Sequence, residues 1–163
     1  MTNARKLQLT TPSPREVVIT RTLDAPRHLV FKAYTTPELL KRWMGPREWE
    51  MTVCEIDLRV GGRYRYVWRG PEGMEMGMGG VFREIARPER IVNTEAFIPP
   101  MYPGEAQDTM VLTEQGGTTT VTITVLYPSR EARDMVLKTP MEAGMNAGFA
   151  RLDELLASAT EAA

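Results

Sequence analysis

Cysteine and histidine are nearly absent from this sequence, and each scarcity excludes a class of site. Cys54 is the only cysteine, so the chain forms no internal disulfide and does not require an oxidising compartment. His28 is the only histidine. A zinc site draws its ligands from clusters of cysteine and histidine, and no such cluster exists here. We therefore expect neither a metal site nor a bound cofactor.

Long apolar runs and an excess of one charge are missing as well. No apolar stretch reaches the roughly 18 residues of a membrane span, and residues 1–16 contain no hydrophobic signal core. The 20 Lys and Arg residues balance the 21 Asp and Glu residues, whereas a general nucleic-acid binder needs a basic excess. These features predict a cytoplasmic protein with no membrane span and no nucleic-acid partner.

The length and the ends of the chain suggest a single folded unit. A chain of 163 residues is typical of one domain and can bury a full core. Residues 1–14 are polar and contain two prolines, which favours a flexible N-terminal tail. We expect one domain over residues 15–158, followed by a frayed C-terminus at 159–163.

The order of the predicted elements is one strand, two short helices, six strands and one long helix. The two helices end near Tyr34 and Met44. Alternation of apolar and polar residues, interrupted by Gly and Pro turns, predicts the strands at 16–23, 50–59, 63–69, 74–86, 90–97, 107–114 and 118–127. Short connections make the last six an antiparallel meander.

Residues 130–157 predict a long C-terminal helix with one apolar face. Met141, Met145 and Phe149 recur at four-residue steps on this face. Gly144 and Gly148 lie beside them, one turn apart, although each glycine costs a helix about 1 kcal/mol relative to alanine. Either the helix backbone packs closely on another element, or the missing side chains leave room for a ligand.

Three segments resemble a known family. The most specific is EIDLRVGGRYRY at 55–66, and GGVFREIARPERIVNTEAF at 79–97 and GMNAGFARLDELLA at 144–157 fit the same family. Over roughly residues 15–158 the chain is similar to the START-like helix-grip (SRPBCC) superfamily. Within it, the chain looks like the bacterial relatives of the activator of the ninety-kilodalton heat-shock protein's ATPase.

The resemblance implies an α+β helix-grip fold. In this fold a curved antiparallel sheet, here of seven strands, wraps around the long C-terminal helix and leaves a cavity between them. Two positions depart from the family pattern. Met44 and Met145 stand where relatives often carry tryptophan, so flexible side chains replace rigid rings beside the expected cavity.

The expected cavity walls give the candidate ligand-binding residues. Their aromatic and thioether side chains suit an apolar ligand, although apolar strand faces more often serve only as core. The candidates are Trp43, Tyr66, Trp68, Met76, Met78, Met141, Met145 and Phe149.

Few residues are candidates for polar chemistry near the expected cavity, and we name no catalytic residue. Glu55, Asp57, Arg59 and Glu84 are candidates for orienting a polar ligand, but ordinary cross-strand ion pairs explain them better. Cys54 has strand parity with the core, where a thiol is usually inert.

Two classes of function fit these observations. The first is a binding protein that encloses a hydrophobic or amphipathic small molecule. The second is a co-chaperone-like domain with a protein partner, and an exposed stripe of Arg63, Arg65 and Arg69 could serve its interface. A cyclase- or dehydratase-type enzyme is a third and weaker possibility, since no pair of residues is evident as general acid and base. A homodimer is left open.

Overall fold

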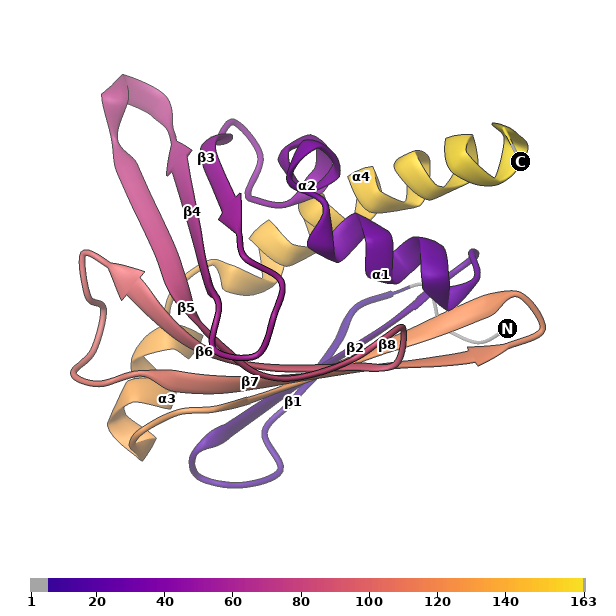
Figure 1. The fold of residues 1–163 in the computed structure, drawn as a ribbon. Coiled ribbons are helices and arrows are strands. Elements are labelled where there is room, and N and C mark those ends of the chain that lie inside the picture. Colours follow the sequence, from indigo (N-terminus) through magenta and orange to yellow (C-terminus); the bar gives the residue numbers. More distant parts are fainter. Residues whose placement is uncertain (1–5, 163) are drawn as a thin grey trace.

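The computed structural model describes residues 6–162, which form one antiparallel sheet and a set of helices (Figure 1). The elements in chain order are β1 (Gln8–Thr10), β2 (Glu16–Leu23), α1 (Arg27–Thr35), α2 (Pro37–Trp43), β3 (Glu50–Ile56), β4 (Arg63–Arg69), a 3-10 turn (Pro71–Gly73), β5 (Glu75–Ala86), β6 (Arg90–Ile98), β7 (Ala106–Gln115), β8 (Thr118–Leu126), α3 (Arg130–Leu137) and α4 (Met141–Ala162).

The described residues form a sheet of eight strands, not the predicted seven. Its order is β1-β2-β8-β7-β6-β5-β4-β3, and every neighbouring pair is antiparallel. The six-strand meander from β3 to β8 is confirmed. The additional strand is β1, where Gln8–Thr10 pairs with Val18–Thr20 inside the segment predicted as a flexible tail. Three residues are too few for a clear alternation, so this edge strand carried no sequence signal.

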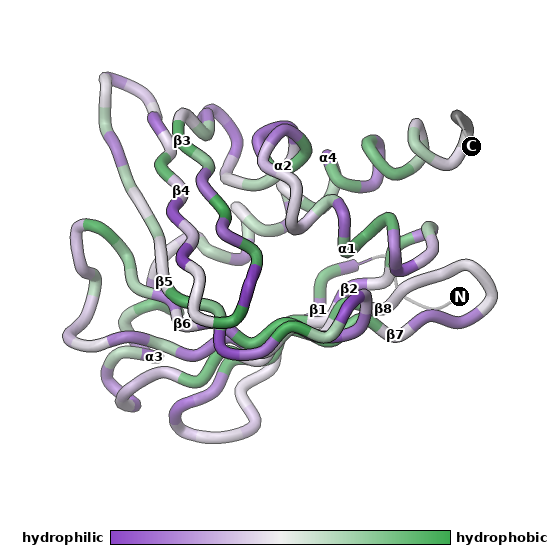
Figure 2. The backbone as a smooth tube through the Cα atoms, in the orientation of Figure 1, coloured by the Kyte–Doolittle hydropathy of each residue, from purple (hydrophilic) through white to green (hydrophobic). Residues whose placement is uncertain are grey.

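The sheet curves, and α1, α2 and α4 lie on its concave side (Figure 1). Strand residues alternate between the two faces, and Figure 2 shows the matching alternation of hydropathy along β3 and β4. Tyr64, Tyr66 and Trp68 of β4 are buried on the inner face, while Arg63, Arg65 and Arg69 are exposed on the outer face. The strand parity predicted for β4 is therefore correct.

The predicted helix over 130–157 is two helices. α3 ends at Leu137, and α4 begins at Met141, so Lys138, Thr139 and Pro140 separate them. A proline lacks the N–H that a continuous helix would need at this point, and it disfavours helical geometry in the preceding residue. α4 then continues to Ala162, beyond the boundary at which we expected fraying.

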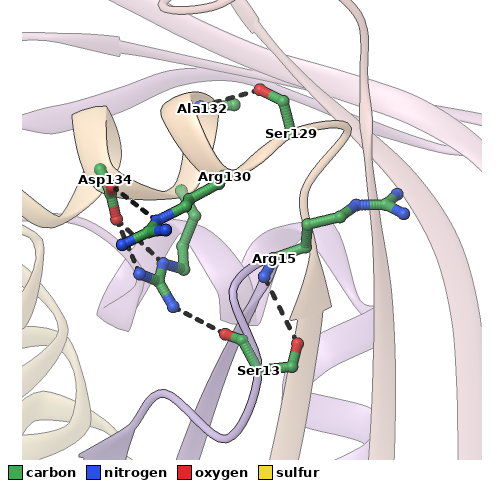
Figure 3. A network of polar contacts seen from close by, with 7 residues as sticks. Ser13, Arg15, Ser129, Arg130, Ala132 and Asp134 are labelled. Atoms are coloured by element: carbon green, nitrogen blue, oxygen red, sulfur yellow. Dashed lines mark hydrogen bonds and ion pairs between the residues drawn. The ribbon is translucent and has the colours of Figure 1, made fainter.

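α3 is held to the first part of the sheet by a polar network (Figure 3). The Ser129 side chain caps α3 by accepting from the Ala132 backbone N–H at 3.0 Å. Arg133 donates to the Ser13 carbonyl at 2.6 Å and pairs with Asp134 at 2.8 Å. Arg15 donates through its Nε to the Tyr127 carbonyl at 2.8 Å. These contacts fix the loop between β1 and β2 against the chain that leads from β8 into α3.

α4 has its large buried side chains between Phe149 and Leu156, around and just after its middle. Phe149, Leu152, Leu155 and Leu156 are buried, and each buried side chain of this size contributes about 1.5–3 kcal/mol. The summed burial free energy of these four side chains exceeds the helix-propensity cost of Gly144 and Gly148, which is about 1 kcal/mol each. Met141 and Met145 in the N-terminal half are only half-buried. The helix is therefore anchored mainly through residues 149–156.

Candidate functional site

Trp43, at the end of α2, is the centre of a closely packed region. Its indole N–H donates to the Ala33 carbonyl at 3.0 Å, and its ring lies 6.3 Å from that of Phe149 on α4. Trp68 on β4 donates to the Met44 carbonyl at 3.0 Å. We call Trp43, Gly45, Trp68, Gly148, Phe149 and Arg151 the Trp43 clamp. It joins α2, α4 and β4.

The backbone carbonyls at the end of α2 are satisfied by α4. The guanidinium of Arg151 donates to the Trp43 carbonyl at 3.0 Å and 3.1 Å and also to the Gly45 carbonyl. The last carbonyls of a helix have no partner within it, and a cation there also interacts favourably with the helix dipole. Arg151 thus provides a C-terminal cap from another helix, which no local sequence signal reveals.

The helix glycines serve close packing. A Cβ at Gly148 would lie 3.2 Å from the Trp43 carbonyl oxygen, and one at Gly144 would lie 3.4 Å from Pro46. Both glycines therefore face the α2 end and the loop that follows it, so their missing side chains let α4 approach this segment. Of the two explanations left open by the sequence, the structure supports backbone packing.

An ion pair between buried Arg21 and the largely exposed Asp153 fixes α4 to β2. Arg21, only 6% exposed, points from the inner face of β2 to Asp153, with N–O distances of 2.6 Å and 3.1 Å. Its guanidinium also lies 5.6 Å from the centre of the Phe149 ring. Since a buried cation is costly without a partner, this pair specifies the position of the C-terminal half of α4.

The structure places all eight predicted ligand-binding residues in or against the core. Four of them are buried: Trp43, Tyr66, Trp68 and Phe149. All of these except Tyr66 belong to the Trp43 clamp. The four methionines, Met76, Met78, Met141 and Met145, are half-buried against the core. In β4–β5 register, Met76 lies opposite Trp68 and Met78 lies opposite Tyr66, so β5 places both on the inner face.

The polar candidates taken from the sequence do not face this interior. Glu55, Asp57 and Glu84 are exposed, as is Arg59, which pairs with Asp57 at 2.8 Å. They belong to the surface ion pairs that we considered the better explanation. A hollow of about 540 Å³ lies on the same outer face, lined by Glu55, Asp57, Arg63, Arg65 and neighbouring residues.

A second polar group, which the sequence analysis missed, lies on the inner face. Asn93 and Glu95 of β6 point inward with Phe97, and Asp108 of β7 lies directly opposite Asn93. Asn93 donates to the Tyr64 hydroxyl at 3.1 Å, and that hydroxyl donates to the Thr94 carbonyl at 2.6 Å. We call Tyr64, Asn93, Glu95, Tyr102, Asp108 and Tyr127 the acid–tyrosine cluster.

Two buried polar atoms of the acid–tyrosine cluster have no hydrogen-bond partner among the described residues. They are Oδ1 of Asp108 and the hydroxyl of Tyr102. Tyr102 is only 5% exposed, and its ring contacts those of Phe97 and Tyr127 at 6.3 Å and 5.7 Å. Most buried polar groups are paired, so two unpaired atoms in one place require an explanation.

The electrostatics of the acid–tyrosine cluster are strongly perturbed. Burial raises the pKa of Asp108 well above its ordinary value, and the nearby charge of Glu95 and a hydrogen bond shared with it raise it further, while Asn93 lowers it. Burial, followed by the charges of Glu95 and Asp108, raises the pKa of Tyr102 and of Tyr64. Within residues 6–162, no Lys or Arg forms an ion pair with either acid.

A sequence signal for these acids existed. In IVNTEAF, Asn93 and Glu95 share parity with Ile91 and Phe97, and in AQDTMVL, Asp108 shares parity with Met110. A polar residue on the inward parity of a strand is unusual enough to indicate a site. The sequence analysis instead considered the polar residues around β3 and β4, whose parity points outward.

Other chemistry is limited in the part of the chain that the structure describes. Burial raises the pKa of Cys54 to about 11, so its thiol is not activated. Among residues 6–162, no group of three or more His, Cys, Asp or Glu side chains gathers as metal ligands do. No helix in the same range is both long and apolar enough to cross a bilayer.

Comparison with solved structures supports the fold over nearly the whole chain. A protein from Rhodobacter sphaeroides is 31% identical, with a TM-score of 0.88, and the match covers 94% of this chain and 99% of that one. Protein NE0264 from Nitrosomonas europaea is 25% identical, with a TM-score of 0.81 and coverage of 93% and 99%.

A more distant structure shares the fold over part of the chain. An HSP90 activator from Plasmodium falciparum is 24% identical, with a TM-score of 0.56, and the match covers 70% of this chain and 74% of that one. This likeness shows a shared fold. No curated protein matches the sequence. The family described as activator of Hsp90 ATPase homolog 1-like protein matches residues 24–157, and the chain therefore belongs to this family.

Proposed function

We propose that this protein binds a hydrophobic or amphipathic small molecule between the inner face of the sheet and α4. The observation that carries the proposal is a pair of buried polar atoms, the Tyr102 hydroxyl and Asp108 Oδ1, on a face otherwise lined by aromatic rings; neither atom has a hydrogen-bond partner in the part of the chain that the structure describes. Ligand sites are typically apolar with a few convergent polar groups, and this inner face has that composition.

The half-buried methionines support the same proposal. Met76 and Met78 come from the sheet, and Met141 and Met145 come from the N-terminal half of α4. Methionine side chains are flexible and polarizable, so they adapt to ligands of different shapes. The eight residues named from the sequence remain the proposed walls, with the acid–tyrosine cluster as the polar part. A cytoplasmic location stays a prediction.

Two measurements test this function. Native mass spectrometry of freshly expressed protein should reveal a co-purified small molecule. Independently, the neutral fluorophore N-phenyl-1-naphthylamine should bind with one-to-one stoichiometry. Met145→Trp should weaken fluorophore binding about tenfold, because the larger side chain would fill the interior. A tenfold loss of affinity corresponds to about 1.4 kcal/mol. Met74, which is 51% exposed, provides the control Met74→Trp, which should bind as the wild type does.

The binding proposal fails if the fluorophore does not bind stoichiometrically, or if the two tryptophan variants weaken it equally. Equal weakening would place the probe outside the interior.

A protein-interaction role is the second candidate, and the family description favours it. The proposed basic stripe gives it little support, because Arg65 and Arg69 lie 3.6 Å and 3.9 Å from Glu55 and Glu75, which balance their charges. Titrating the protein into an Hsp90-type ATPase from a bacterium would test this role. Stimulation that saturates would support it, and an unchanged rate up to high micromolar protein would exclude it.

A further inference from the structure

We propose that the acid–tyrosine cluster recognises a protonated amine, so that the ligand is an apolar molecule with a cationic head group. The inference rests on the proposed binding function and specifies the chemistry of its polar end. It begins from the composition of the inner face, where Glu95 and Asp108 lie close together among tyrosine rings.

The charges of the acid–tyrosine cluster favour a cationic ligand. Elsewhere the fold gives its buried cation an acidic partner, since Arg21 meets the largely exposed Asp153 through two N–O contacts, while its Nε has no hydrogen-bond partner among the described residues. Glu95 and Asp108 have no such cationic partner within residues 6–162. Two neighbouring acids in a low-dielectric interior repel each other, and a bound cation would relieve this repulsion.

The acid–tyrosine cluster also has acceptor atoms that the described residues leave unused. An ammonium group only donates hydrogen bonds, and it needs acceptors. Oδ1 of Asp108 and the Tyr102 hydroxyl oxygen can both accept, and neither has a partner among the described residues. A carboxylate ligand would instead bring a negative charge next to Glu95 and to Asp108, whose pKa is already raised by burial and by the charge of Glu95.

The aromatic rings around the acids favour a cation as well. The rings of Tyr102 and Tyr127 are 5.7 Å apart and nearly perpendicular, and the rings of Tyr64 and Tyr66 are 5.1 Å apart. Electron-rich ring faces attract cations, and this attraction is stronger where water is excluded. Acids and tyrosines together therefore favour an amine over a neutral group of the same size.

The test uses three probes of equal chain length, octylamine, 1-octanol and octanoate, each competing with bound N-phenyl-1-naphthylamine near pH 7. Octylamine should bind about tenfold more tightly than 1-octanol, the difference expected of a desolvated cation among rings and acids. Octanoate should bind most weakly. Asp108→Asn and Glu95→Gln should each reduce the amine preference while leaving 1-octanol affinity unchanged. Glu55→Gln, on the exposed outer face, is the control and should keep the preference.

The number of protons released on amine binding is a second readout. A purely structural role of Asp108 would not change it. A bound cation favours the ionised form of Asp108, so amine binding should release protons, and amine affinity should rise with pH while 1-octanol affinity does not. The groups facing Asp108 are Glu95, Asn93 and the tyrosines of the cluster. Titration calorimetry in two buffers of different ionisation enthalpy measures the release, and thermal melts confirm that each variant is folded.

The outcomes separate the two proposals. If the fluorophore does not bind at all, the binding function itself is wrong. If it binds but 1-octanol or octanoate displaces it as well as octylamine does, the function stands and the amine inference is wrong. Retention of the amine preference in both Asp108→Asn and Glu95→Gln would also overturn the inference.

Discussion

The Trp43 clamp and the acid–tyrosine cluster lie in the same interior but differ in how far their buried polar groups are paired by hydrogen bonds. In the clamp, the indole N–H groups of Trp43 and Trp68 both donate to backbone carbonyls, and Arg151 satisfies the carbonyls at the end of α2. In the cluster, Asp108 Oδ1 and the Tyr102 hydroxyl are buried without a partner among residues 6–162. A buried polar group without a partner is costly, so the clamp contributes to stability, whereas the cluster is the region that we propose for binding.

The glycines sharpen this contrast. Gly148 lets α4 approach the Trp43 carbonyl, and Gly45 lies against the Trp68 indole, where an added Cβ would be only 2.5 Å from the ring nitrogen. Small residues in the clamp thus allow close approach. The wall proposed for the ligand instead contains long, flexible methionines. Glycines in the long helix do not by themselves indicate a cavity beside it.

The largest effect is expected for Trp43→Ala. It removes a buried indole together with its hydrogen bond to Ala33 and its contact with Phe149, and such truncations cost about 3–5 kcal/mol. Chemical denaturation measures the loss of unfolding free energy. Trp49→Ala is the control because Trp49 is only half-buried, so its loss should be clearly smaller. Equal losses would mean that the clamp has no special role in stability.

A smaller loss is expected for Gly148→Leu. The added side chain would collide with the Trp43 carbonyl, and overpacking costs about 1–3 kcal/mol. Ala150→Leu on the exposed side of α4 is the matched control and should be nearly neutral. If Gly148→Leu keeps full stability but abolishes fluorophore binding, the glycine faces the ligand, and the contrast between the two regions is wrong.

The smallest effect is a change in the pH dependence of stability, caused by Asp108. Its folded-state pKa is raised, so above the ordinary value of 3.8 the folded protein holds a proton that the unfolded chain releases. Stability should therefore fall as pH rises from about 4 through the raised pKa. Thermal melts from pH 5 to pH 8 should show this fall in the wild type and a weaker fall in Asp108→Asn. Asp57→Asn, at an exposed carboxyl, should follow the wild type.

Much of the fold was predictable because strand parity and turn residues are local properties. The alternation in β4 placed Tyr64, Tyr66 and Trp68 on the inner face, and the turns fixed the meander from β3 to β8. The sequence failed where local signals are weak or compete. β1 is only three residues long, and the apolar spacing across Pro140 suggested one helix where the chain forms two.

The sequence by itself determined the α+β class, the order of the main elements and the side chains that face inward, since each follows from periodicity within one segment. Only the tertiary structure decided what the inward residues contact. Asp108 meets Asn93 because β6 and β7 pair in one register, and Gly148 meets Trp43 because α4 crosses the end of α2. Contacts between segments far apart in the chain depend on packing, and packing brings the acid–tyrosine cluster together.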